Sequence, residues 1–100
     1  MEVYIDDKEL EKLYKTGKSK KLKLAVNVID KFFAAIEYID ASHNIYDLWN
    51  HPSLNFEKYK KHYSIRLTGK FRLEMEVNWI NEEKTIGEFH LFSISNHYGD

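Results

Sequence analysis

Apolar and polar residues alternate most regularly over the segment 70–79. The two sets are Phe71, Leu73, Met75, Val77 and Trp79 against Lys70, Arg72, Glu74, Glu76 and Asn78. This two-residue period predicts an antiparallel strand with one buried face and one wet face. A shorter alternation over 63–68 predicts a partner strand, and Thr68-Gly69 between them predicts a tight turn.

A third strand is predicted over 86–94, after a turn at 81–84. Its alternation is mixed, because Phe89 and Leu91 face one way while His90, Phe92 and Ile94 face the other. Large apolar side chains therefore occur on both faces. This mixture predicts a β-bulge or a partly covered second face.

The first half of the chain has a helical period instead. A helix about 30 Å long is predicted over 20–41. Its apolar stripe recurs every three or four residues, at Ala25, Ile29, Phe32, Phe33, Ile36 and Ile39. A stripe of this length must pack against another layer of the protein.

Three shorter elements complete the pattern. Val3–Ile5 reads as a short strand, and a helix follows from a cap at Asp6 or Asp7 to about Tyr14, with Gly17 as its stop. A helical turn is predicted over 44–50, before Pro52 breaks the chain. Its apolar residues, expected to point inward, are Ile45, Leu48 and Trp49.

Helices that precede strands along the chain indicate an α+β fold rather than a doubly wound α/β fold. We expect two N-terminal helices packed on a small antiparallel sheet, with the short N-terminal strand joined to a three-stranded C-terminal meander. One hundred residues bury only about 60–65% of their unfolded surface. The sequence therefore predicts a single domain over residues 1–100.

Composition excludes several classes of protein. The chain is 43% hydrophobic and 31% charged, which argues against a disordered tail, a collagen-like repeat and a membrane span. It contains no Cys, no Gly-rich phosphate loop and no His-x-x-x-His pair. We therefore expect no metal site and no cofactor. The first ten residues lack a basic segment followed by an apolar run, so we expect a cytoplasmic protein.

The net charge of −1 hides an uneven distribution. Six basic residues and no acid lie between Lys58 and Arg72, and a second cluster consists of Lys18, Lys20, Lys21 and Lys23. Such local charge permits a polyanionic partner, although solvated faces are the simpler interpretation. If the strands pair through Thr68-Gly69, Arg66 and Arg72 lie on one side of the sheet, where two guanidinium groups could hold a phosphate. The alternative is surface salt bridges to Glu74 or Glu76, worth about 0–1 kcal/mol.

Short motifs add a resemblance to a known family. His51-Pro52 precedes the sheet, and Tyr63–Leu73 (YSIRLTGKFRL) has the form aromatic-Ser-Ile-Arg-Leu, turn, aromatic-Arg-Leu. Ser95–Tyr98 (SNHY) lies near the C-terminus, and Leu10–Gly17 ends a helix in Gly. In their order and spacing these motifs resemble the RelE/ParE superfamily of type II toxins, and most closely its HigB-like (plasmid maintenance killer) branch.

The resemblance implies an enzyme that enters the ribosomal A site and cleaves mRNA without a metal. Its partners would be the ribosome, mRNA and a cognate antitoxin, often of helix-turn-helix type, with no membrane involved. Carried over by motif, Arg72 would hold the scissile phosphate, and His51 together with His97 or Tyr98 would serve proton transfer. The expected RNA-binding residues are Lys58, Lys60, Lys61, Arg66 and Lys70.

The chain departs from the family pattern after His51-Pro52. HigB-like enzymes often continue His-Pro-Leu-Lys-Gly, whereas this chain continues Ser53-Leu54-Asn55, so that Lys58 or Lys60 would have to replace the missing lysine. The resemblance leaves two alternatives open, a ParE-like gyrase inhibitor and a catalytically inactive module that binds RNA or an antitoxin. A plain interaction domain, with its cations scattered over the surface, is a third.

Overall fold

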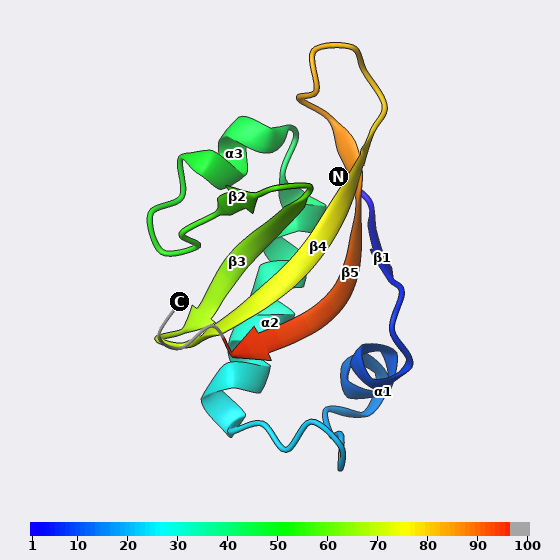
Figure 1. Ribbon diagram of the computed structural model, residues 1–100, viewed down its shortest axis with the longest axis vertical. Coiled ribbons are helices and arrows are strands. Elements are labelled where there is room, and N and C mark those ends of the chain that lie inside the picture. The colour runs from blue at the N-terminus through cyan, green and yellow to red at the C-terminus, as the bar shows by residue number, and fades with distance from the viewer. Residues whose placement is uncertain (97–100) are drawn as a thin grey trace.

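The computed structural model describes residues 1–96 and has the α+β fold that the pattern predicts (Figure 1). Three helices and five strands follow one another along the chain. In order they are β1 (Val3–Ile5), α1 (Lys8–Thr16), α2 (Val26–Ala41), α3 (Ile45–Trp49), β2 (Glu57–Tyr59), β3 (His62–Thr68), β4 (Phe71–Trp79) and β5 (Gly87–Asn96).

The strands form one sheet in the order β1-β5-β4-β3-β2. Strands β2 to β5 are antiparallel, but β1 runs parallel to β5, so the expectation of a wholly antiparallel sheet is wrong. A two-residue period shows that a segment is a strand and does not specify its direction. Strand β2 was not predicted, because all three of its residues are exposed and leave no alternation to read.

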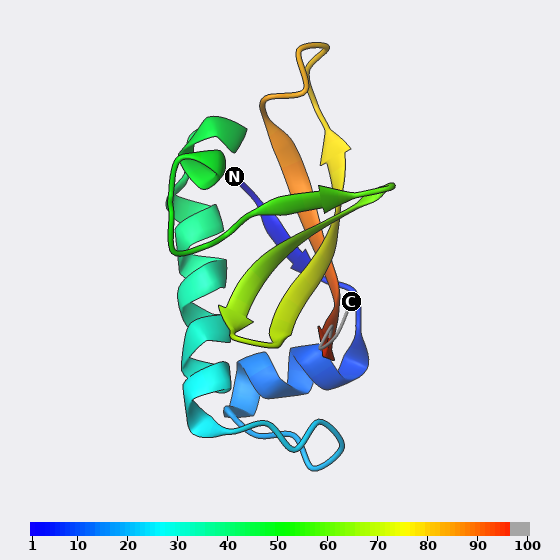
Figure 2. The ribbon, with the colours of Figure 1, turned by 60° about the vertical axis from the view of Figure 1, so that its left-hand side comes forward.

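The molecule has a helical layer on one face of the sheet and no helix on the other face in the described part (Figures 1 and 2). The core lies between the two layers, where the stripe of α2 meets the apolar side chains of β3, β4 and β5. Its fully buried members include Leu10, Phe32, Ile39, Ile65, Leu73, Met75, Phe89 and Leu91. The sheet therefore presents its polar side chains to solvent.

The two long helices differ in how well their starts were predicted. Asp7 caps α1 by accepting hydrogen bonds from the Glu9 and Leu10 amides, and Gly17 ends it at a φ of 74°, as expected. Helix α2 begins only at Val26 and spans about 24 Å, not 30 Å. Like charges three residues apart oppose a helix in the lysine-rich segment before it, where Lys23 takes a φ of 47°.

The short helix α3 buries Ile45 and Leu48 as predicted. Trp49 does not follow them, since 44% of its surface is exposed and its ring packs edge-on against Phe56 at 4.6 Å. The prediction that Trp49 points into the core is therefore wrong. The loop after α3 contributes Leu54 and Phe56 to the core instead.

Strand β5 contains the bulge that its mixed pattern predicts. Leu91 pairs with Met75 and Ser93 with Glu74, so Phe92 is the extra residue. Beyond the bulge the alternation is reversed. Ile94 consequently lies opposite Leu73 and packs against the core, which corrects its assignment to the same face as His90.

Gly87 begins β5 in a space that admits no side chain. A Cβ atom there would lie 2.5 Å from Val77 Cγ1 and 3.1 Å from the carbonyl oxygen of Asn78. We expect Gly87→Ala to lower the free energy of unfolding by about 1–3 kcal/mol, as overpacking does elsewhere. Urea denaturation measures the change.

Gly69 provides the matched control, because a Cβ atom at Gly69 would meet nothing within 4 Å. We expect Gly69→Ala to change the free energy of unfolding by less than about 0.5 kcal/mol. Equal stability of the two variants would contradict the close packing around Gly87.

Candidate functional site

The polar face of the sheet, which we call the open face, gathers the side chains that could carry chemistry. The strand pairing places on it Tyr4, Glu57, Tyr59, His62, Ser64, Arg66, Arg72, Glu74, Glu76, His90 and Ser93. Arg66 and Arg72 are a directly opposed cross-strand pair. The predicted turn at Thr68-Gly69 is wrong by one residue, because Thr68 pairs with Phe71 and the turn is Gly69-Lys70, and a register shift between Arg66 and Thr68 brings the two arginines opposite each other. The two guanidinium groups therefore share one side of the sheet.

Arg72 is held firmly by its own chain. Its Nε donates to Ser64 Oγ at 2.7 Å, and its Nη2 donates to the carbonyl oxygen of Asn55 at 2.6 Å and to that of Ser64 at 3.3 Å. Glu57 lies 3.8 Å away, and only 11% of the Arg72 side chain is exposed. Burial lowers the pKa of Arg72 below its usual value, with Glu57 opposing that effect. A guanidinium nevertheless stays charged at neutral pH, so Arg72 is a fixed cation.

Arg66 differs from Arg72 because it is exposed and forms no ion pair within residues 1–96. Like charges directly opposite each other destabilise a sheet. Glu57 and Glu74 reduce this repulsion from the side of Arg72. An anion bound beside Arg66 would reduce it further, and so the pair suits a phosphate.

The lysines expected to bind RNA are dispersed. Lys58 pairs with Tyr63, and its Nζ lies 5.7 Å from the centre of that ring, which belongs to the apolar face. Lys70 lies 5.7 Å from the ring of Phe71, which is on the apolar side of β4. Lys60 and Lys61 are exposed at the turn between β2 and β3. Lys60 Nζ lies 5.4 Å from the centre of the Tyr59 ring on the open face. Of the expected cations in the described residues, the two arginines thus lie on the open face and Lys60 lies at its edge.

His51 lies in the loop that leads to β2. Its Nδ1 is 2.9 Å from Ser53 Oγ, and its ring contacts that of Tyr38 on α2 edge-on at 4.3 Å. These contacts place His51 beside the helical layer, and none of the described contacts joins it to Arg72. The same loop does supply the Asn55 carbonyl that Arg72 binds. The other two expected catalytic residues, His97 and Tyr98, lie outside the described residues.

A histidine–carboxylate pair on the open face was not among the expected site residues. His62 Nε2 lies 3.3 Å from Glu76 Oε1, and both side chains are accessible. The ring of Phe92, the bulge residue, meets that of His62 edge-on at 4.8 Å. The alternation in the sequence could have indicated this pair. His62 lies four residues before Arg66 on β3, and Glu76 lies four residues after Arg72 on β4, so both lie on the same face as the arginines.

Further ionisable and aromatic side chains extend from Glu76 across the open face to β1. Glu76 pairs with His90, whose Nδ1 lies 2.9 Å from Asp6 Oδ2 and whose ring stacks on Tyr4 at 4.9 Å. The Tyr4 hydroxyl donates to Glu2, which raises the pKa of Tyr4. Acidic groups therefore dominate this end of the open face, and the arginine pair lies at the opposite end.

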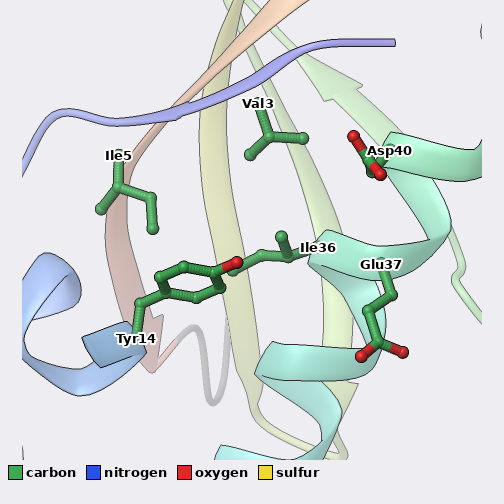
Figure 3. Close-up of a pocket in the computed structure, with 6 residues that line it drawn as sticks. All are labelled: Val3, Ile5, Tyr14, Ile36, Glu37 and Asp40. Carbon is green, nitrogen blue, oxygen red and sulfur yellow. The ribbon is translucent and has the colours of Figure 1, made fainter. Parts of the chain in front are cut away.

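A cavity of about 230 Å³ lies between β1 and the helices α1 and α2, away from the arginines (Figure 3). Apolar side chains from β1 and α2 form its floor, and its charged residues are Glu37 and Asp40. Two carboxylates would repel a phosphate, so this cavity is a poor site for a nucleic acid.

Residues 1–96 contain no group of three His, Asp or Glu side chains arranged to hold a metal ion. None of the helices in this range has both the length and the apolar character needed to span a bilayer. Comparison of the sequence with protein-family models and with curated proteins gives no match.

Proposed function

We propose that this chain is the toxin of a type II toxin–antitoxin system, an endoribonuclease that cleaves mRNA on the ribosome without a metal. The observation that supports this most is the opposed pair of Arg66 and Arg72 on a sheet face that no helix covers in the described part. The resemblance of the surrounding segment to HigB-like toxins supplies the reaction and the partners. The protein would act in the cytoplasm and be neutralised by a cognate antitoxin.

Metal-free RNA cleavage needs a base for the 2′-hydroxyl, cations for the phosphorane-like transition state and an acid for the leaving 5′ oxygen. Arg72, fixed by Ser64 and Asn55, would stabilise the transition state because its charge needs no reorganisation. Exposed Arg66 would contact a neighbouring phosphate. His51 and His97 are the proposed proton-transfer groups, and Tyr98 is a further proposed catalytic residue.

The test is cleavage of a defined mRNA by the purified protein, with and without purified ribosomes. We expect fragments with 5′-hydroxyl ends, produced only when ribosomes are translating. Binding of RNA without any cleavage would favour the inactive-module alternative. Loss of DNA supercoiling by gyrase without RNA cleavage would favour the ParE-like alternative.

Arg66 provides a separate prediction about RNA binding. Each phosphate contact on single-stranded RNA contributes about −0.7 to the slope of log affinity against log salt. We expect Arg66→Ala to weaken binding of a single-stranded oligonucleotide and to make that slope shallower by about 0.7. Fluorescence anisotropy over a series of salt concentrations measures both.

Lys12→Ala is the control for this experiment, because Lys12 is an exposed cation on α1, in the helical layer. It should leave the slope unchanged. An unchanged slope for Arg66→Ala as well would exclude Arg66 from the RNA-binding surface.

A further inference from the structure

The accessible pair of His62 and Glu76 lies on the same face as the arginines and has the geometry of an oriented base. Their closest atoms, His62 Nε2 and Glu76 Oε1, are 3.3 Å apart, and their side chains are 46% and 63% exposed. When the Nε2–H of a neutral imidazole faces a carboxylate, Nδ1 carries the lone pair. The imidazole can then accept a proton at Nδ1 while the carboxylate stabilises the resulting cation.

The bulge in β5 supports the orientation of this imidazole. An extra residue in a strand redirects a side chain, and here Phe92 reaches across β4 to meet the His62 ring edge-on at 4.8 Å. Glu76 on β4 and Phe92 on β5 therefore both contact the same ring. A surface histidine held only by an ion pair would lack the second contact.

The distance to Arg72 suits a single phosphodiester group. The Arg72 Nε donates to Ser64 Oγ, and so the guanidinium lies beside Ser64. Ser64 and His62 are two residues apart on one face of β3, a separation of about 6.7 Å. A phosphodiester group with a hydrogen bond of about 2.9 Å to Arg72 on one side and to His62 on the other spans such a gap.

We infer that His62, oriented by Glu76, is the general base that accepts the proton of the RNA 2′-hydroxyl. The inference rests on the proposed function. It assigns to His62 the role of base in place of His51, whose ring packs against Tyr38, and it adds Glu76 as a positioning residue. The 2′-oxygen forms a bond to phosphorus as its proton moves to His62 Nδ1, and the bond from phosphorus to the 5′ oxygen breaks. The leaving oxygen takes a proton from the general acid of the proposed function. The products are a 2′,3′-cyclic phosphate and a 5′-hydroxyl.

The experiment compares the rate of single-turnover mRNA cleavage on ribosomes with the affinity for a non-cleavable 2′-deoxy oligonucleotide. We expect His62→Gln to lower the rate at least about a hundredfold, since general bases contribute about 10²–10⁴-fold. Glu76→Gln should lower it less, because Glu76 acts through the imidazole. Both variants should bind the oligonucleotide within about twofold of the wild-type affinity, since neither removes a cation that contacts phosphate.

Two further variants separate a catalytic role from a structural one. Added imidazole should restore part of the activity of His62→Ala, and Glu76→Asp should retain more activity than Glu76→Gln. His43→Gln and Glu82→Gln are matched controls, because both residues are exposed and lie outside the open face. Neither control should change the rate.

Wild-type activity in His62→Gln would overturn the inference while leaving the proposed nuclease intact. A loss of affinity as large as the loss of rate would also overturn it, because His62 would then contribute binding alone. A wild-type protein that cleaves no RNA would overturn the proposed function, and this inference with it.

Discussion

Replacing Arg72 by alanine should abolish most RNA cleavage and destabilise the fold at the same time. A charged donor aimed at a developing oxyanion contributes about 10²–10³-fold to a rate. We therefore expect the rate of single-turnover cleavage to fall at least about a hundredfold. The substitution also leaves the Asn55 carbonyl and Ser64 without a donor in a partly buried site. An unsatisfied buried group costs about 1–3 kcal/mol, which urea denaturation should detect.

The two effects can be separated with Arg72→Lys. Lysine keeps the charge but presents no planar fork, so it cannot hold Ser64 Oγ and the Asn55 carbonyl as Arg72 does. We expect this variant to recover part of the stability and little of the activity. The described residues use only Nε and Nη2 of Arg72 for hydrogen bonds, so a phosphate would bind through Nη1. Full cleavage by Arg72→Ala at a temperature where it is folded would exclude Arg72 as a phosphate ligand.

The sheet face that carries Arg72 could be predicted from the sequence because a hairpin has few degrees of freedom. The alternation on both sides of the turn places Arg66 and Arg72 on the polar face of their strands. Their direct opposition depends on a turn at Gly69-Lys70 and on a register shift between Arg66 and Thr68, neither of which the pattern indicates. Burial of the apolar set of β4 follows from the same period. The α+β class follows from the order of the two kinds of period along the chain.

The partners of individual side chains could not be predicted in this way. Nothing local indicates that the loop before β2 lies along β3, where the Arg66 amide donates to the Leu54 carbonyl at 2.8 Å. That loop brings the Asn55 carbonyl to Arg72 and leaves His51 against Tyr38. The parallel pairing of β1 likewise depends on how the chain returns to the sheet after its helices. Long-range contacts of this kind are decided by packing and have no counterpart in a local pattern.

Replacing Phe32 by alanine should cause the largest loss of stability among these variants. Phe32 is fully buried on α2, in the layer that covers the apolar face of the sheet. Truncation of a buried phenylalanine costs about 3–5 kcal/mol, because the lost burial is joined by the cavity that remains. A domain of this kind has about 5–15 kcal/mol of stability in total. Phe32→Ala therefore removes a large part of it, measured as a lower urea midpoint at unchanged slope.

Phe33→Ala and Val26→Ala complete this test on the same helix. Phe33 is half-buried, so Phe33→Ala should lower the free energy of unfolding less than Phe32→Ala does. Val26 is 73% exposed, so Val26→Ala should change it by less than about 0.5 kcal/mol. Equal losses at Phe32 and Phe33 would mean that α2 is rotated about its axis relative to the sheet. Because Phe32 touches neither arginine, its variant should cleave RNA at the wild-type rate per folded molecule, which distinguishes support of the sheet from participation in the site.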